Sequence, residues 1–159
     1  MKPARVFIAV LVVGALFAPA GCGGSEEQKT ATANADMKAQ VEQVCREVAT
    51  ELKGLEMPTT QDAAVKTQTQ SAEIFQTAAG KLRELQADAP LPADYKSWID
   101  AYGQLPALNT QAAAAFSKSG ITSDQAVEAG QKWEAQAMKA NDLASKAGLT
   151  NCVVSQPKG

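Results

Sequence analysis

Residues 37–55 read MKAQVEQVCREVATELKGL, with large apolar residues at steps of three and four. This spacing matches the 3.6-residue period of an α-helix and places the apolar residues along one face. Asn34 is a suitable N-cap for the helix, and Gly54 marks its expected end. The apolar stripe of this first predicted helix comprises Met37, Val41, Val44, Val48, Leu52 and Leu55.

A second predicted helix opens at Pro58 and Thr59, where Thr59-x-x-Asp62 has the spacing of a capping box. It should stop before Pro90, because proline cannot continue a helix. Its stripe comprises Val65, Ala72, Phe75, Ala79, Leu82 and Leu85.

A third predicted helix begins near Pro92 and ends at Gly120. Gly103 and Pro106 fall inside it, and an interior proline removes a backbone donor and clashes with the preceding turn. The helix should therefore kink around Tyr102 or break into two pieces. Its stripe comprises Tyr95, Trp98, Tyr102, Leu105, Leu108, Ala112, Ala115 and Phe116.

The last predicted helix is capped by Thr122 or Ser123 and closed by Gly148, with Leu149 available for the hydrophobic contact of a C-terminal cap. Short loops join the four helices, and no period-two segment of strand length precedes the last few residues. We therefore expect an all-α fold, an antiparallel four-helix up-down bundle with one kinked helix. Residues 36–159 have the length of one domain.

The N-terminus has the layout of an export signal. Lys2 and Arg5 precede the apolar run 6–18, and Ala20 and Gly21 lead into Cys22. These residues resemble a bacterial lipoprotein signal peptide, although Pro19 stands where that family usually has an aliphatic residue. The whole chain is similar to small exported bacterial lipoproteins with a helical domain and one disulfide.

The resemblance implies removal of residues 1–21, acylation of Cys22, and a lipid anchor in the bacterial cell envelope on the extracytoplasmic side. The alternative is an ordinary secretory signal cut near Ala20, which would give a secreted protein. After Cys22, residues 25–35 read SEEQKTATANA and contain no large apolar residue, so we expect residues 22–35 to form a flexible tether.

Export changes the interpretation of the other two cysteines, Cys45 and Cys152. Outside the cytoplasm a pair of thiols tends to oxidise, so we expect a disulfide between them. In an up-down bundle the end of the last helix lies near the start of the first, which brings the two residues close together. The alternative is two buried free thiols.

The chain contains no histidine, which removes the commonest general base and histidine ligation of metals or haem. We therefore expect no metal site and no cofactor. Asp94 and Asp100 are better interpreted as surface charges than as an acid and base pair. With 15 Lys and Arg residues against 17 Asp and Glu, the net charge is −2 and gives no basic footprint for nucleic acid.

The aromatic residues Tyr95, Trp98 and Tyr102 share one helical stripe, and such rings form either the core or a ligand groove beside the kink.

The sequence is compatible with three functions. The first is a non-catalytic binding or interaction module displayed at the membrane by its lipid. The second is a small-ligand carrier with a pocket at these rings, for which Gln68, Thr69 and Gln104 are candidate polar groups. The third, which the sequence supports least, is an enzyme that uses carboxylates alone. We therefore expect that the protein is not an enzyme.

Overall fold

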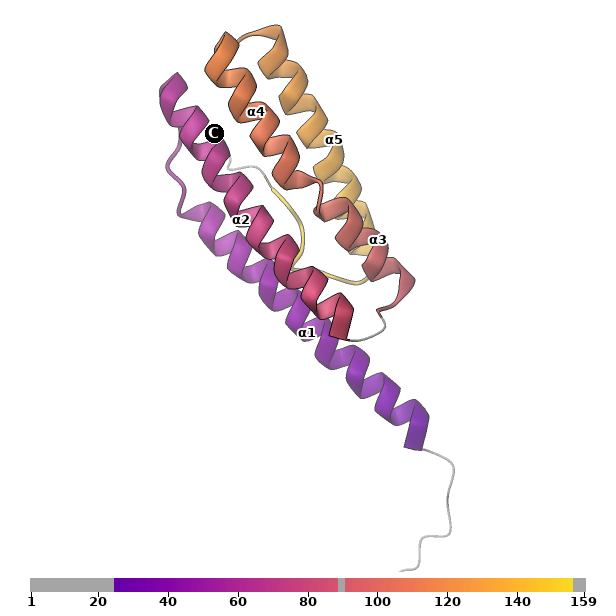
Figure 1. Ribbon diagram of the computed structural model, residues 1–159. Coiled ribbons are helices and arrows are strands. Elements are labelled where there is room, and N and C mark those ends of the chain that lie inside the picture. Colours follow the sequence, from indigo (N-terminus) through magenta and orange to yellow (C-terminus); the bar gives the residue numbers. More distant parts are fainter. Residues whose placement is uncertain (1–24, 89–90, 156–159) are drawn as a thin grey trace, which may run out of the picture.

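The computed structural model describes residues 25–88 and 91–155, which fold into helices joined by short connections (Figure 1). No strand occurs in these residues. The predicted signal peptide (residues 1–21) and the candidate lipidation residue Cys22 lie outside the described residues. The helices are α1 (Ser25–Lys53), α2 (Gln61–Asp88), α3 (Ala93–Tyr102), α4 (Leu105–Ser119) and α5 (Asp124–Lys146).

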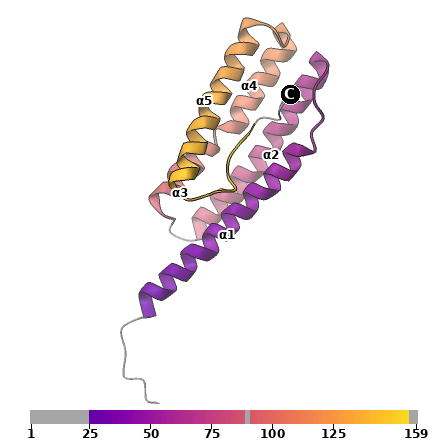
Figure 2. The same ribbon diagram turned by 180° about the vertical axis from the view of Figure 1, so that it is seen from behind.

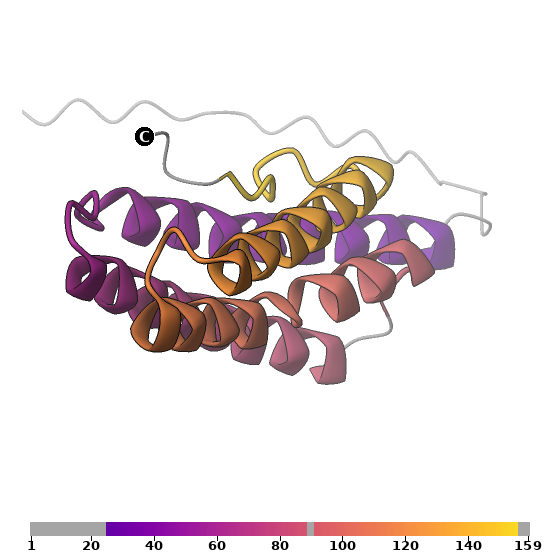
Figure 3. The same ribbon diagram turned by 90° about the horizontal axis from the view of Figure 1, so that it is seen from above.

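Sequential helices are neighbours in the bundle, as the view from above shows (Figure 3). α1 packs on α2, α2 packs mainly on α4, and α5 packs on both α3 and α4. α3 and α4 together occupy the third position of the bundle, with a bend of 15° between them. The predicted antiparallel four-helix arrangement with one kinked helix is therefore confirmed.

The break between α3 and α4 follows from Pro106 in the first turn of α4. Proline has no N–H, so the carbonyl of Tyr102 loses the donor that a continuous helix would provide. α3 accordingly ends at Tyr102, with Gly103 as its C-cap. From α5, Gln136 Nε2 donates to the carbonyl oxygen of Ala101 at 2.7 Å, which satisfies part of the interrupted ladder. The break expected around Tyr102 is confirmed.

α1 begins earlier than its apolar stripe indicates. Asn34 is not the N-cap, because the helix already starts at Ser25 and covers most of the segment 22–35 that we expected to be a flexible tether. Between Ser25 and Lys53 there is no glycine or proline, and Ala, Glu, Gln and Lys extend an existing helix at little cost. As a result α1 projects beyond the other helices at its N-terminal end (Figure 1).

Two caps fix the starts of α2 and α5. The backbone N–H of Ala63 donates to Thr60 Oγ1 at 3.2 Å, so Thr60 caps α2 and the expected cap at Thr59 is wrong by one residue. At α5, Ser123 Oγ accepts from the N–H of Ala126 at 3.2 Å, as expected for a serine N-cap.

The core combines a few large rings and aliphatic side chains with many alanines. Trp98, Leu82 and Leu105 are completely buried, and Phe75 is nearly so. The small residues on α5 allow close approach to α3 and α4. The buried alanines on that helix are Ala126, Ala137, Ala140 and Ala144.

The end of α5 turns through Gly148, which has a φ of 68°. The N–H of Leu149 donates to the carbonyl of Ala144 at 2.8 Å, and the N–H of Gly148 to that of Ser145 at 3.1 Å. This pair of bonds is the Schellman motif, and its hydrophobic contact is provided by Leu149, which is 1% exposed. The cap predicted at Gly148 is therefore present, and it directs the chain back across the bundle.

Replacing Gly148 with alanine is expected to lower the free energy of unfolding by about 1–2 kcal/mol, because a Cβ is strained at positive φ. The Cβ itself would meet no close neighbour, so the cost is conformational. The matched control is Gly130→Ala inside α5, where the space is also open and alanine should instead stabilise by about 0.5–1 kcal/mol. Urea denaturation measures both; effects of the same sign would contradict the assigned backbone conformation.

Candidate functional site

The residues after Gly148, here called the C-terminal strap (residues 149–155), run along the bundle between α1 and α5 (Figure 2). α1 and α5 do not pack extensively against each other in the described structure. The strap closes this side of the bundle instead, and it buries Leu149, Cys152 and Val154. It is therefore part of the core although it belongs to no helix.

A disulfide fixes the strap to α1. Cys45 on α1 and Cys152 in the strap are bonded, with Cα atoms 5.0 Å apart, although their sequence positions differ by 107. Both side chains are buried, at 5% and 2% exposure. The disulfide predicted for this pair is present.

Polar side chains hold the strap on both sides. On α1, Glu42 accepts from the N–H of Thr150 at 3.3 Å and from Asn151 Nδ2 at 3.0 Å. On α5, Asn141 accepts from the N–H of Val154 at 2.7 Å and donates to its carbonyl oxygen at 3.0 Å. The strap backbone is thus supported by both helices that it separates, as a segment without its own hydrogen-bond ladder requires.

A pocket of about 290 Å³ lies between the C-terminal half of α1, the α1–α2 loop and the strap. We call it the strap pocket. Its buried walls are apolar, and two of them are the rings of Phe75 and Tyr102. The disulfide forms another part of the wall. The remaining lining residues are Val48, Ala49, Leu52, Lys53, Leu55, Met57, Asn151, Val153, Val154 and Ser155.

Tyr102 connects this pocket to the core. Its ring meets Phe75 edge-on, with centroids 5.5 Å apart, and lies 5.2 Å from the ring of Trp98. A tyrosine hydroxyl is protonated at neutral pH, and burial raises the pKa of Tyr102 further above its ordinary value. The pocket wall therefore presents neutral groups at this point.

The three aromatic residues proposed as a groove do not form one. Tyr95, Trp98 and Tyr102 are only 8%, 0% and 2% exposed and belong to the core. Only Tyr102 lines the strap pocket. Helical spacing shows which residues share a face but not what covers that face, which is why the core and the groove were alternatives in the sequence.

The polar groups suggested for a carrier pocket are also elsewhere. Thr69 and Gln104 are exposed and donate to carbonyls of their own chain segment, those of Val65 and Asp100. Gln68 is half-buried and does not line the strap pocket.

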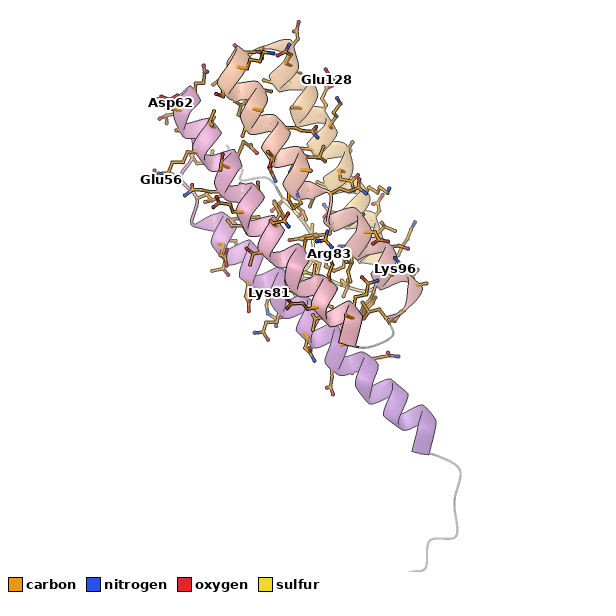
Figure 4. All side chains as sticks on the ribbon, in the orientation of Figure 1. Glu56, Asp62, Lys81, Arg83, Lys96 and Glu128 are labelled. Carbon is orange, nitrogen blue, oxygen red and sulfur yellow. A yellow bond between two sulfur atoms is a disulfide. The ribbon has the colours of Figure 1, made fainter. Side chains whose placement is uncertain are left out.

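Several acidic residues form separate ion pairs, and no charged acidic side chain lines the strap pocket. Lys81 donates to Glu47 at 2.7 Å, and this hydrogen bond lowers the pKa of Glu47 and raises that of Lys81. Asp100, once considered as an acid or base, pairs with Lys96 on the surface at 2.9 Å. Lys81, Lys96 and Glu128 all lie on the outside of the bundle (Figure 4). Within residues 25–88 and 91–155, no group of three or more His, Cys, Asp or Glu residues is placed to hold a metal ion.

A second hollow of about 310 Å³ lies on the other side of the α1–α2 loop. Most of its lining residues are polar, among them Glu56, Lys66 and Gln70. The strap pocket, with its buried apolar walls, has more of the character of a ligand site.

The chain matches no known protein-family model, and neither curated proteins nor solved structures give a match. None of the helices in the described part of the chain is long and apolar enough to span a membrane.

Proposed function

We propose that this protein is a non-catalytic binding protein of the bacterial cell envelope, anchored by lipid at Cys22, that holds a small apolar ligand in the strap pocket. The anchor rests on the signal sequence alone. The ligand site rests on one observation, the pocket of about 290 Å³ with apolar buried walls. Small-molecule sites are typically concave, mostly apolar and close to this size or larger.

Surface composition supports a pocket more than a broad protein-binding face. Of the exposed large hydrophobic residues of the described chain, Met57 and Val153 both line the strap pocket, whereas Val127 and Met138 lie on α5 and do not line it. Single apolar residues on a surface are normal, whereas apolar residues around a pocket favour ligand entry. The remaining one, Ile121, lies between α4 and α5. Display of a flat interaction surface is therefore the second candidate.

A pocket-filling substitution tests the proposal. Ala49 is half-buried and lines the pocket, so Ala49→Phe should occupy part of its volume. The neutral probe N-phenyl-1-naphthylamine, whose fluorescence rises when it leaves water, should bind the unsubstituted protein. We expect Ala49→Phe to weaken this binding by tenfold or more, because an overfilled pocket excludes the probe.

The matched control is Ala114→Phe, the same change at an exposed position of α4 away from the pocket. It should bind the probe as the unsubstituted protein does. Urea midpoints of both variants show that they fold. Equal binding by the Ala49→Phe and Ala114→Phe variants, or no binding by the unsubstituted protein, would contradict the proposed function.

A further inference from the structure

Polarity in the strap pocket changes with depth. The buried lining residues are all apolar or aromatic, with Phe75 and Tyr102 among them. The charged or strongly polar side chains that line it, those of Lys53, Asn151 and Ser155, belong to exposed residues. A site with an apolar interior and a polar mouth matches a ligand that has an apolar tail and a polar head.

The charge at the mouth has one sign. Lys53 is the only charged residue that lines the pocket, and none of the lining residues is acidic. In the part of the chain that the structure describes, Lys53 forms no ion pair, whereas Lys81, Lys96 and Lys132 each do. An ammonium group at the mouth favours an anionic head group.

The volume of the strap pocket matches one short chain. At roughly 30 Å³ for each water-sized group, a pocket of about 290 Å³ accommodates about ten such groups. The two chains of a membrane phospholipid have a larger volume than this. Met57, half-exposed at the mouth, has an unbranched and flexible side chain that can adapt to a linear tail.

Building on the proposed function, we infer that the ligand is a single-chain anionic amphiphile, a fatty acid of about ten carbons, with its tail against Phe75 and Tyr102 and its carboxylate at Lys53. Lys53 also lies in the last turn of α1, where a cation offsets the negative end of the helix dipole. That structural role affects stability but not the choice between head groups, so the two roles are separable.

The test compares decanoate, decanol and decyltrimethylammonium by calorimetric titration into the full chain carrying Cys22→Ser, which removes the acylation site. We expect decanoate to bind most tightly and decyltrimethylammonium least. Lys53→Gln should weaken the binding of decanoate about three- to fivefold, which corresponds to the energy of an exposed charge pair. It should leave the affinity for decanol unchanged. Added salt should weaken the binding of decanoate but not that of decanol, because it screens the attraction between Lys53 and the carboxylate.

The matched control is Lys139→Gln, an exposed lysine of α5 outside the pocket, which should change none of the three affinities. Decanol binding as tightly as decanoate, or an unchanged decanoate affinity in the Lys53→Gln variant, would overturn the inference and leave the proposed function intact. No binding of the three compounds, together with no binding of N-phenyl-1-naphthylamine, would overturn both.

Discussion

Replacing Cys45 and Cys152 with alanine together is expected to lower the free energy of unfolding by roughly 4–5 kcal/mol. The disulfide closes a loop of 107 residues, and in the chain-entropy model such a cross-link removes this much freedom from the unfolded chain. The loss is a large fraction of the stability of a typical domain. Urea denaturation followed by circular dichroism measures it.

The unsubstituted protein with a thiol reductant should show the same loss, since reduction removes the same cross-link. Cys22→Ser should show none. The double variant should also be cut by protease within the strap, because only noncovalent contacts, such as the hydrogen bonds of Glu42 and Asn141 and the burial of Leu149, then hold it. Equal stability with and without the disulfide would mean that the strap is held by its noncovalent contacts and that the loop-closure argument does not apply here.

Trp98→Ala is expected to lower the free energy of unfolding by roughly 3–5 kcal/mol, the usual cost of removing a buried aromatic side chain. Trp98 is completely buried and lies against Tyr102. Its indole N–H has no hydrogen-bond partner among the described residues, so the loss reflects packing and not a broken hydrogen bond. Thermal and urea denaturation measure the change.

The control is Met138→Ala, at an exposed position of α5, which should change stability by no more than about 0.5 kcal/mol. A similarly small effect of Trp98→Ala would contradict its place in the core and would restore the interpretation of the aromatic stripe as a ligand groove. The pair of variants thus separates the two interpretations that helical spacing left open.

The helices were predictable because burial imposes a period on the sequence. Val41, Val44 and Val48 of the first stripe are buried as the spacing indicates, and Pro106 located the break in the third helix. The start of α1 was not predictable from the stripe, because residues 25–33 carry no large apolar side chain and their helix depends on propensity. The N-cap of α2 is Thr60 and not the neighbouring Thr59, and the spacing of the sequence does not distinguish two adjacent threonines.

The strap pocket could not be predicted from the sequence, for a different reason. Its walls come from α1, α2, α3 and a segment with no helical period, and they meet only through the tertiary fold. The pairing of Cys45 with Cys152 indicated that the tail crosses the bundle. It did not indicate that the residues after Cys152 leave a gap beside Val48 and Phe75.

The early start of α1 determines how far the pocket lies from the N-terminal end of that helix. From Ser25 to Val48 the chain rises about 35 Å along one continuous helix, at 1.5 Å per residue. This length is about the thickness of a bilayer core, so the proposed acylation of Cys22 would attach the lipid near the end of α1 that lies far from the pocket.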